Sequence, residues 1–151
     1  MVKHVIDCDA DPFLPQGWEV EEHRKGGQVE YDPSKITLHL SKNQRDGKVM
    51  GGNELREELR TMPVMNANVL DWYLAHPELI PPDWKGKLVC FWGTIYRSSG
   101  GGGLYVFYLS WDGDRWRWSY IWLGHGFGDR NPAVLSQENV LEPSTIVEAQ
   151  N

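Results

Sequence analysis

The stretch LVCFWGTIYRSSGGGGLYVFYLSWDGDRWRWSYIWLGHGF, residues 88–127, decides the fold of this chain. Two runs of β-branched and aromatic residues meet at Asp112-Gly113, and the stretch holds five of the eight tryptophans. Asp-Gly readily accepts the two positive φ angles of a type I′ hairpin turn. A third run, LVCFWGTIYR, precedes these two across the loop SSGGGG. The stretch therefore predicts a three-stranded antiparallel meander.

A two-residue turn also predicts the register of the second and third strands. Side chains alternate between the two faces of a sheet, so the register decides which residues share a face. The predicted pairs on the aromatic face are Trp111 with Asp114, Leu109 with Trp116, Phe107 with Trp118 and Tyr105 with Tyr120. The pairs on the mixed face are Leu104 with Ile121, Val106 with Ser119, Tyr108 with Arg117 and Ser110 with Arg115.

Composition places the chain among ordinary globular proteins. Its 151 residues fit one domain, and 40% hydrophobic with 24% charged residues is typical of a folded chain. A net charge of −6 argues against binding to nucleic acid or to an anionic membrane surface. No signal peptide and no run of eighteen apolar residues is present, so we expect a cytoplasmic protein with no membrane association. Cys8 and Cys90 have no metal-binding spacing and are expected to be reduced.

The first half of the chain predicts short strands and two helices. The strands are expected at residues 4–7, 18–23, 28–31 and 35–41, with 28–31 returning as the partner of 18–23. Asn53 is a suitable N-cap for a helix with Leu55 and Leu59 on its apolar stripe. A second, buried helix is expected to start at Asn66 or Asn68. Residues 133–148 have no clear period, and the tail, 143–151, is expected to pack loosely or to be disordered.

Together these elements predict a single α+β domain spanning residues 1–151. Its antiparallel sheet carries a C-terminal, three-stranded, Trp-rich meander packed on two short helices. Two interpretations of the aromatic face stay open. It is either the main core against the second helix, or a platform on which a ligand or partner stacks.

The N-terminal cluster Asp7, Asp9 and Asp11 is the most chemistry-like group in the first half. A calcium-binding loop would need Gly at its sixth position and Glu at its twelfth, but Pro12 and Trp18 stand there. The motif of aspartate-dependent phosphatases has no matching lysine or acidic partner downstream. A solvated acidic turn is therefore the expected structure, and a metal site at these aspartates is the alternative.

The segments NANVLDWYLAHPELIPPDWKGK and FWGTIYRSSGGGGLYVFYLSWDGDRWRWSYIWL, followed by NPAVL, resemble a group of small uncharacterised bacterial proteins. The N-terminal IDCDADPFLPQGWEVEEHRKGG and the central NELREEL are similar as well, so the resemblance covers nearly the whole chain. It implies a complete domain of bacterial type. It carries no activity, ligand or catalytic residue over to this sequence.

We expect a non-catalytic binding or protein-interaction module of unknown ligand. No catalytic residue and no cofactor are predicted. The ligand-binding residues are expected on the meander: Trp92, Trp116, Trp118, Tyr120, Arg115 and Arg117. The partner would be a protein or a small molecule, and homodimerisation through the aromatic face is an alternative. A small hydrolase or metal-dependent enzyme using the aspartate cluster is the second hypothesis.

Overall fold

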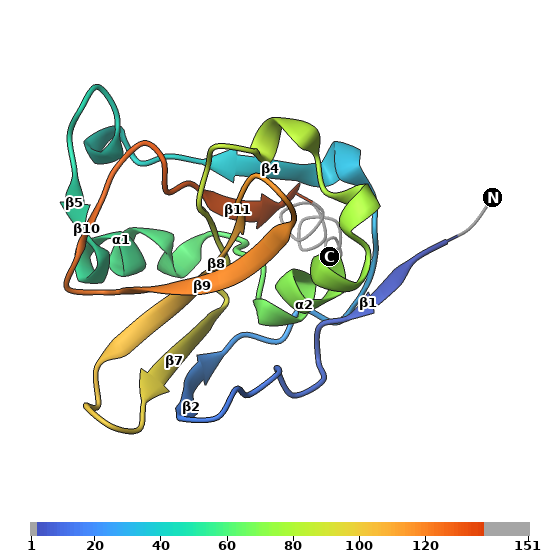
Figure 1. Ribbon diagram of the computed structural model, residues 1–151, viewed down its shortest axis with the longest axis horizontal. Coiled ribbons are helices and arrows are strands. Elements are labelled where there is room, and N and C mark those ends of the chain that lie inside the picture. Colours follow the sequence, from blue (N-terminus) through green and yellow to red (C-terminus); the bar gives the residue numbers. More distant parts are fainter. Residues whose placement is uncertain (1–2, 138–151) are drawn as a thin grey trace, which may run out of the picture.

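Strand β8 (Leu104–Trp111) is the centre of a seven-stranded sheet in the computed structural model, which describes residues 3–137 (Figure 1). One edge of β8 pairs along its length with β9 (Trp116–Trp122). Its other edge pairs with β7 (Thr94–Ser98) and then with β6 (Val89–Cys90). The remaining strands lie further out, in the order β2-β7-β8-β6-β11-β4, and are β2 (Trp18–His23), β4 (Ile36–His39) and β11 (Ala133–Ser136).

Two small two-stranded sheets and two helices complete the fold. The small sheets are β1 (Val5–Asp7) with β3 (Gln28–Glu30), and β5 (Met50–Gly51) with β10 (Gly126–Phe127). The α-helices are α1 (Gly52–Glu58) and α2 (Ala67–Ala75). Short 3-10 helices span Pro33–Lys35, Lys42–Gln44, Leu59–Thr61, Pro77–Leu79 and Pro82–Trp84. The predicted α+β class with an antiparallel-rich sheet is confirmed. Within residues 3–137 no helix is long and apolar enough to cross a membrane.

The register between β8 and β9 differs from the prediction by two residues. Trp111 pairs with Trp116 and Tyr105 with Trp122, across a four-residue loop instead of a two-residue turn. The Asp112 carboxylate is the cause, because it accepts hydrogen bonds from the backbone N–H groups of Asp114 and Arg115. A shift of two residues leaves every side chain on its predicted face.

The predicted first strand of the meander is interrupted by a bulge at Trp92-Gly93 that divides it into β6 and β7. Asn66 lies against this bulge, where a Cβ on Gly93 would be 2.8 Å from the Asn66 Cα. Gly93 N donates to Met65 O, and Met65 N donates to Val134 O on β11. Beyond the bulge the sheet continues in two wings, because β7 pairs with β2 while β6 pairs with β11.

Each face of the sheet carries its own core. On the aromatic face, Phe107 and Leu109 pack with Val69 and Tyr73 of α2. On the opposite face, Val106 packs with a second set of buried residues that includes Leu55, Leu59, Trp92, Leu123 and Phe127. The interpretation that the second helix covers the aromatic face is therefore correct for its central part, and α1 covers the other face.

Three local predictions are wrong for identifiable reasons. Strand β2 pairs with β7 instead of with β3. Strand β3 pairs with β1, and the hydrogen bond from Cys8 N to Gly27 O extends this second ladder by one residue. The first helix starts at Gly52, with Gly51 and not Asn53 as its N-cap. The Glu54 carboxylate accepts a hydrogen bond from the backbone N–H of Gly51 and so fixes this start. Residues 133–136 form a buried strand that has no polar alternation. Helix α2 begins after Asn66, one of the two predicted starts. The predicted tail, residues 143–151, lies outside the described residues.

Candidate functional site

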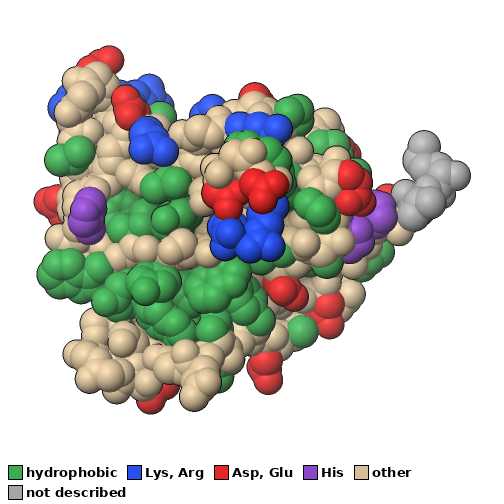
Figure 2. Space-filling view, viewed as in Figure 1, with side chains coloured by type: hydrophobic (Ala, Val, Ile, Leu, Met, Phe, Trp, Pro, Cys, Tyr) green, Lys and Arg blue, Asp and Glu red, His purple; other side chains and the backbone are tan. Residues whose placement is uncertain are grey.

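An open groove runs along the exposed end of β9. We call it the aromatic groove, and its volume is about 440 Å³. Pockets that hold small ligands are typically of roughly 300–1,000 Å³, so this groove has a suitable size. Figure 2 shows a broad apolar area on this side of the molecule, over β8 and β9. Its lining residues are Leu88, Tyr105, Tyr120, Ile121, Trp122, His125, Gly126, Arg130 and Asn131.

Trp122 forms the most exposed wall of the groove. Trp122 and Tyr120 are 54% and 49% exposed, although both are large and aromatic. Two glycines allow the indole to lie close to the backbone. A Cβ on Gly124 would be 2.5 Å from the ring, and one on Gly103 would be 3.3 Å from its Nε1. The indole is therefore fixed in place by its neighbours while one side stays accessible to a ligand.

Three polar side chains adjoin this apolar wall. Arg130 Nε donates to Gly86 O, and no carboxylate in the described part of the chain forms an ion pair with its guanidinium. His125 Nδ1 is 2.8 Å from Gly126 O, so Nδ1 carries the proton and Nε2 is an acceptor when the ring is neutral. Asn131 Oδ1 accepts from Gly128 N, which leaves its amide N–H groups as donors. The groove thus combines aromatic surface with a cation and further donors.

The predicted aromatic residues separate into three environments. Trp116 and Trp118 are half-buried against the aromatic core, whereas Tyr120 reaches the groove. Trp92 is only 2% exposed and packs against Phe127 in the core of the opposite face. Trp92 was expected on the ligand-binding face, and this expectation is corrected. The bulge at Gly93 changes the alternation there and turns the indole inward.

The predicted arginine pair is not assembled as one cationic patch. Arg117 forms an ion pair with Asp112 across the loop of the hairpin, and Arg115 is exposed in that loop. The Arg115 N–H and the Arg117 side chain lower the pKa of the Asp112 carboxyl to about 2. Arg117 therefore stabilises the loop, and the cation that lines the groove together with the exposed aromatic residues is Arg130.

Two of the three N-terminal aspartates, Asp7 and Asp9, accept hydrogen bonds that order their own loop. Asp7 Oδ1 accepts from Asp9 N and from Gln28 Nε2, and Asp9 Oδ1 accepts from Gly27 N. In residues 3–137 no three His, Cys, Asp or Glu side chains are placed to hold a metal ion. The carboxylates act as an acidic turn here, and the metal hypothesis gains no support from their geometry.

Comparison with known protein families, curated proteins and solved structures gave no match to this chain. The resemblance to small bacterial proteins therefore stays a prediction. Any functional assignment must come from the geometry of the sites themselves.

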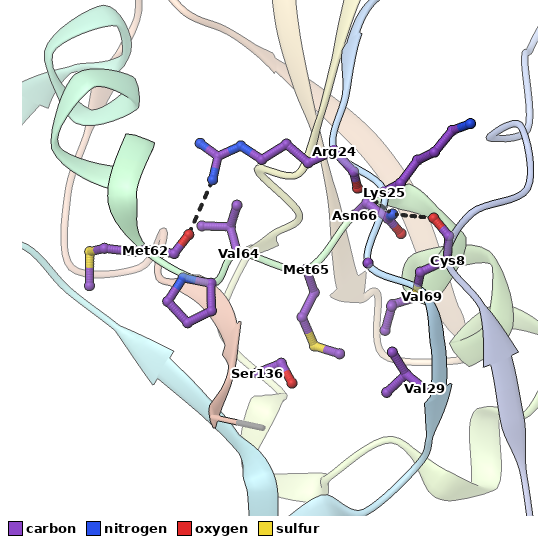
Figure 3. Close-up of a pocket in the computed structure, with 12 residues that line it drawn as sticks. Cys8, Arg24, Lys25, Val29, Met62, Val64, Met65, Asn66, Val69 and Ser136 are labelled. Carbon is purple, nitrogen blue, oxygen red and sulfur yellow. Dashed lines mark hydrogen bonds between the residues drawn. The ribbon is translucent and has the colours of Figure 1, made fainter. Parts of the chain in front are cut away.

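A second cavity, of about 130 Å³, lies where the two wings of the sheet separate (Figure 3). Arg24 lines this cavity and donates to Met62 O and Leu59 O, while Asn66 Nδ2 donates to Cys8 O. Burial, reinforced by Asp7 and Asp9, raises the pKa of the Cys8 thiol to about 11. Cys8 is therefore a neutral thiol at physiological pH and a poor nucleophile. The polar groups of this cavity stabilise the fold.

Ser41, Glu58 and His39 form a cluster that resembles a catalytic triad only in its residue types. Glu58 lies in the middle, with Ser41 Oγ 2.8 Å from Oε1 and His39 Nε2 3.1 Å from Oε2. In a working triad the imidazole contacts the hydroxyl and removes its proton. Here the carboxylate separates the two, so the cluster connects α1 to β4 and does not activate Ser41.

The residues that the sequence prediction missed are Leu88, Tyr105, Ile121, Trp122, His125, Arg130 and Asn131 as joint members of one groove. The corrected register would have placed Trp122 beside Tyr105. Gly124, two residues after Trp122, was the other signal that the sequence offered, whereas the approach of Gly103 to this indole appears only in the structure. Nothing in the sequence brings Arg130 to the same place, because its position follows from the path of the loop before β11.

Proposed function

We propose that this chain is a non-catalytic binding module whose aromatic groove takes a planar, largely apolar ligand with one anionic group. The observation that carries the proposal is the exposure of Tyr120 and Trp122 beside an Arg130 guanidinium with no acidic partner in the described residues. Monomeric proteins seldom expose contiguous large aromatics unless the surface binds something.

The two parts of the groove match the two parts of such a ligand. A ring stacked on Trp122 would gain about 1–3 kcal/mol, as bases do on aromatic side chains. A carboxylate, sulfonate or phosphate would accept hydrogen bonds from the guanidinium, since within residues 3–137 Arg130 donates through Nε alone. His125 would add a second donor when protonated. The ligand is thus oriented with its ring toward β9 and its anion toward the loop before β11.

The test uses 8-anilinonaphthalene-1-sulfonate, a dye with a planar ring system and a sulfonate. We expect saturable binding to the folded protein with an increase in dye fluorescence. Trp122→Ala and Arg130→Gln should each weaken binding about tenfold, because each removes one of the two contacts.

Matched controls remove the same chemistry outside the groove. Leu14→Ala removes an exposed apolar side chain, and Arg45→Gln removes an exposed guanidinium that, like Arg130, donates to one backbone carbonyl. Both controls should bind the dye like the wild type. Equal losses in the controls and in the groove variants, or no saturable binding at all, would contradict the proposal.

A further inference from the structure

Strand β9 has one edge that pairs with no strand in residues 3–137. The hydrogen-bond pattern shows which residues face outward. Leu123 N donates to Leu104 O, so residues 123, 121, 119 and 117 form the bonded pairs with β8. The backbone N–H and C=O groups of Trp116, Trp118 and Tyr120 therefore point away from the sheet.

In the described part of the chain the sheet has two other unpaired edges, on β2 and β4, and both are protected against pairing, whereas the edge of β9 is not. Strand β2 has a register irregularity between Val20 and Glu22 and carries four charged or ionisable side chains in six residues. Strand β4 has only four residues and follows a 3-10 helix that contains Pro33. Bulges, charges and short length are the usual means by which proteins block edge pairing. Strand β9 has seven residues in continuous register, with Arg117 as its only charged side chain.

We propose that β9 is a dimerisation strand, and that its occupant is the β9 strand of a second copy of this chain in antiparallel pairing about a twofold axis. This inference goes beyond the binding function and does not depend on it. A seven-residue strand pairs along its whole length with a symmetry mate only when the axis passes through its central residue, Ser119. Twofold dimers are also the commonest closed assemblies of soluble proteins.

In this register, the outward-facing backbone N–H and C=O groups of one copy lie opposite those of the other copy, so they can form hydrogen bonds. Trp118 lies opposite Tyr120 of the second copy, and Trp116 lies opposite Trp122, so aromatic side chains form cross-strand pairs on one face. On the other face Arg117 lies opposite Ile121, and no two like charges are opposed. Although each copy carries a net charge of −6, β9 contributes no carboxylate to the contact.

The dimer would also remove exposed apolar surface that the monomer retains. Figure 2 shows a tan strip of backbone and other atoms along β9, with an apolar area on each side of it. A second strand paired with β9 would cover this strip and the adjoining parts of both apolar areas. Trp122, 54% exposed in the single chain, would gain Trp116 of the second copy as a neighbour. The second indole would then extend the wall of the aromatic groove, so the two copies would have two equivalent grooves near the axis.

Analytical ultracentrifugation of variants that introduce a charge at position 119 tests both the identity of the partner and the register of the pairing. Wild-type protein is expected to form dimers with rising concentration between about 1 µM and about 1 mM. Ser119→Lys and Ser119→Asp each place a like charge opposite itself at the axis and should weaken dimerisation about tenfold or more. A mixture of the two variants should restore dimers, because opposite charges then meet. Ser110→Lys, which adds a charge one strand further in, should dimerise like the wild type.

Amide hydrogen exchange on the unmodified protein gives an independent readout. The N–H groups of Trp118 and Tyr120 should become protected as concentration rises, while those of Ser119 and Ile121 should be protected at every concentration by their bonds to β8. A wild type that stays monomeric up to about 1 mM overturns the proposal. It is also overturned if both Ser119 variants dimerise like the wild type, or if Trp118 and Tyr120 are protected in a monomer.

Discussion

Trp118 and Trp122 occupy the same face of the same strand, four residues apart, yet Trp118 packs against the core and Trp122 lies on the surface. Trp118 stacks on Phe107, with ring centroids 4.7 Å apart, and Phe13 contacts its edge at 5.6 Å. Among residues 3–137 no aromatic ring packs on Trp122, which is 54% exposed, and its indole lies against two glycines. The difference teaches that the aromatic pattern of a strand predicts a face, whereas the segments packed on that face decide which part of it is core.

The largest expected effect is on stability, and it comes from removing the buried residue on which Trp118 stacks. We call the part of the aromatic face around Trp118 the covered end, and the part around Trp122 the open end. Phe107 is 1% exposed and stacks on both Tyr96 and Trp118. Phe107→Ala should lower the free energy of unfolding by about 3–5 kcal/mol, since a buried Phe→Ala change loses transfer energy and leaves a cavity. Urea denaturation measures this. A loss below about 1 kcal/mol would mean that the covered end is not a packed core.

Phe13→Ala removes the ring that covers the edge of Trp118, together with its contacts to Tyr96 and Phe107, and should make the exposure of Trp118 more like that of Trp122. Phe13 is half-buried, so its loss should cost about 1–2 kcal/mol of unfolding free energy. Hydroxyl-radical footprinting of dilute protein should show Trp118 oxidation rising toward that of Trp122, while Trp122 itself stays unchanged. If Trp118 is as protected in the variant as in the wild type, then α2 alone covers it.

Gly124→Ala tests the open end with little effect on stability. The added Cβ would lie 2.5 Å from the Trp122 ring, which must therefore move. The change in unfolding free energy should stay within about 1 kcal/mol, because the ring is exposed, but binding of 8-anilinonaphthalene-1-sulfonate should weaken severalfold. Gly101→Ala is the control, since nothing lies within 4 Å of its added Cβ. Equal dye binding by both variants would show that the position of Trp122 is unimportant.

The smallest expected effect is a dependence on pH of the packing of Phe13 on Trp118. His23 Nε2 contacts Ala10 O at 3.1 Å, and its Nδ1 contacts Thr94 Oγ1 at 2.9 Å, so this ring holds the loop that carries Phe13. Burial lowers the pKa of His23 below its ordinary value of 6.5. Because folding disfavours the protonated ring, its stabilisation is complete above pH 6.5 and declines as pH falls through the lower folded-state pKa.

Footprinting at about pH 7.5 and about pH 5.5 measures this dependence. Trp118 oxidation should rise at the lower pH while Trp122 oxidation stays constant. In His23→Gln, which cannot titrate, the difference between the two pH values should disappear. A rise of the same size in the variant would assign the effect to another group.

Sequence patterns were sufficient for the class of the fold and for the faces of β8 and β9. Alternation is a local property, and it survived even the two-residue error in register. The error arose because Asp112 uses its side chain to close a longer loop, which the Asp-Gly dipeptide alone does not reveal. The strand Ala133–Ser136 was missed because it is buried on both faces and therefore has no alternation.

The candidate site was harder to predict than the fold, for a physical reason. Tyr120 was correctly placed on the aromatic face, but its exposure depends on whether another segment of the chain packs over it. Arg130 reaches the groove through a loop whose path is set by contacts such as Leu88 N with Arg130 O and Gln44 Nε2 with Asn131 O. Contacts between residues so distant in sequence leave no local pattern.

The junction at Gly93 has a consequence for how the chain folds. Asn66 Nδ2 donates to Cys8 O and to Arg24 O, and Gly93 O accepts from Arg24 N. The segments that meet there come from the beginning, the middle and the last third of the described chain. The hydrogen bonds of this junction form only when all of these segments have come together. The domain should therefore fold as one cooperative unit with slow, long-range closure, and no fragment lacking the N-terminal strands should keep the sheet intact.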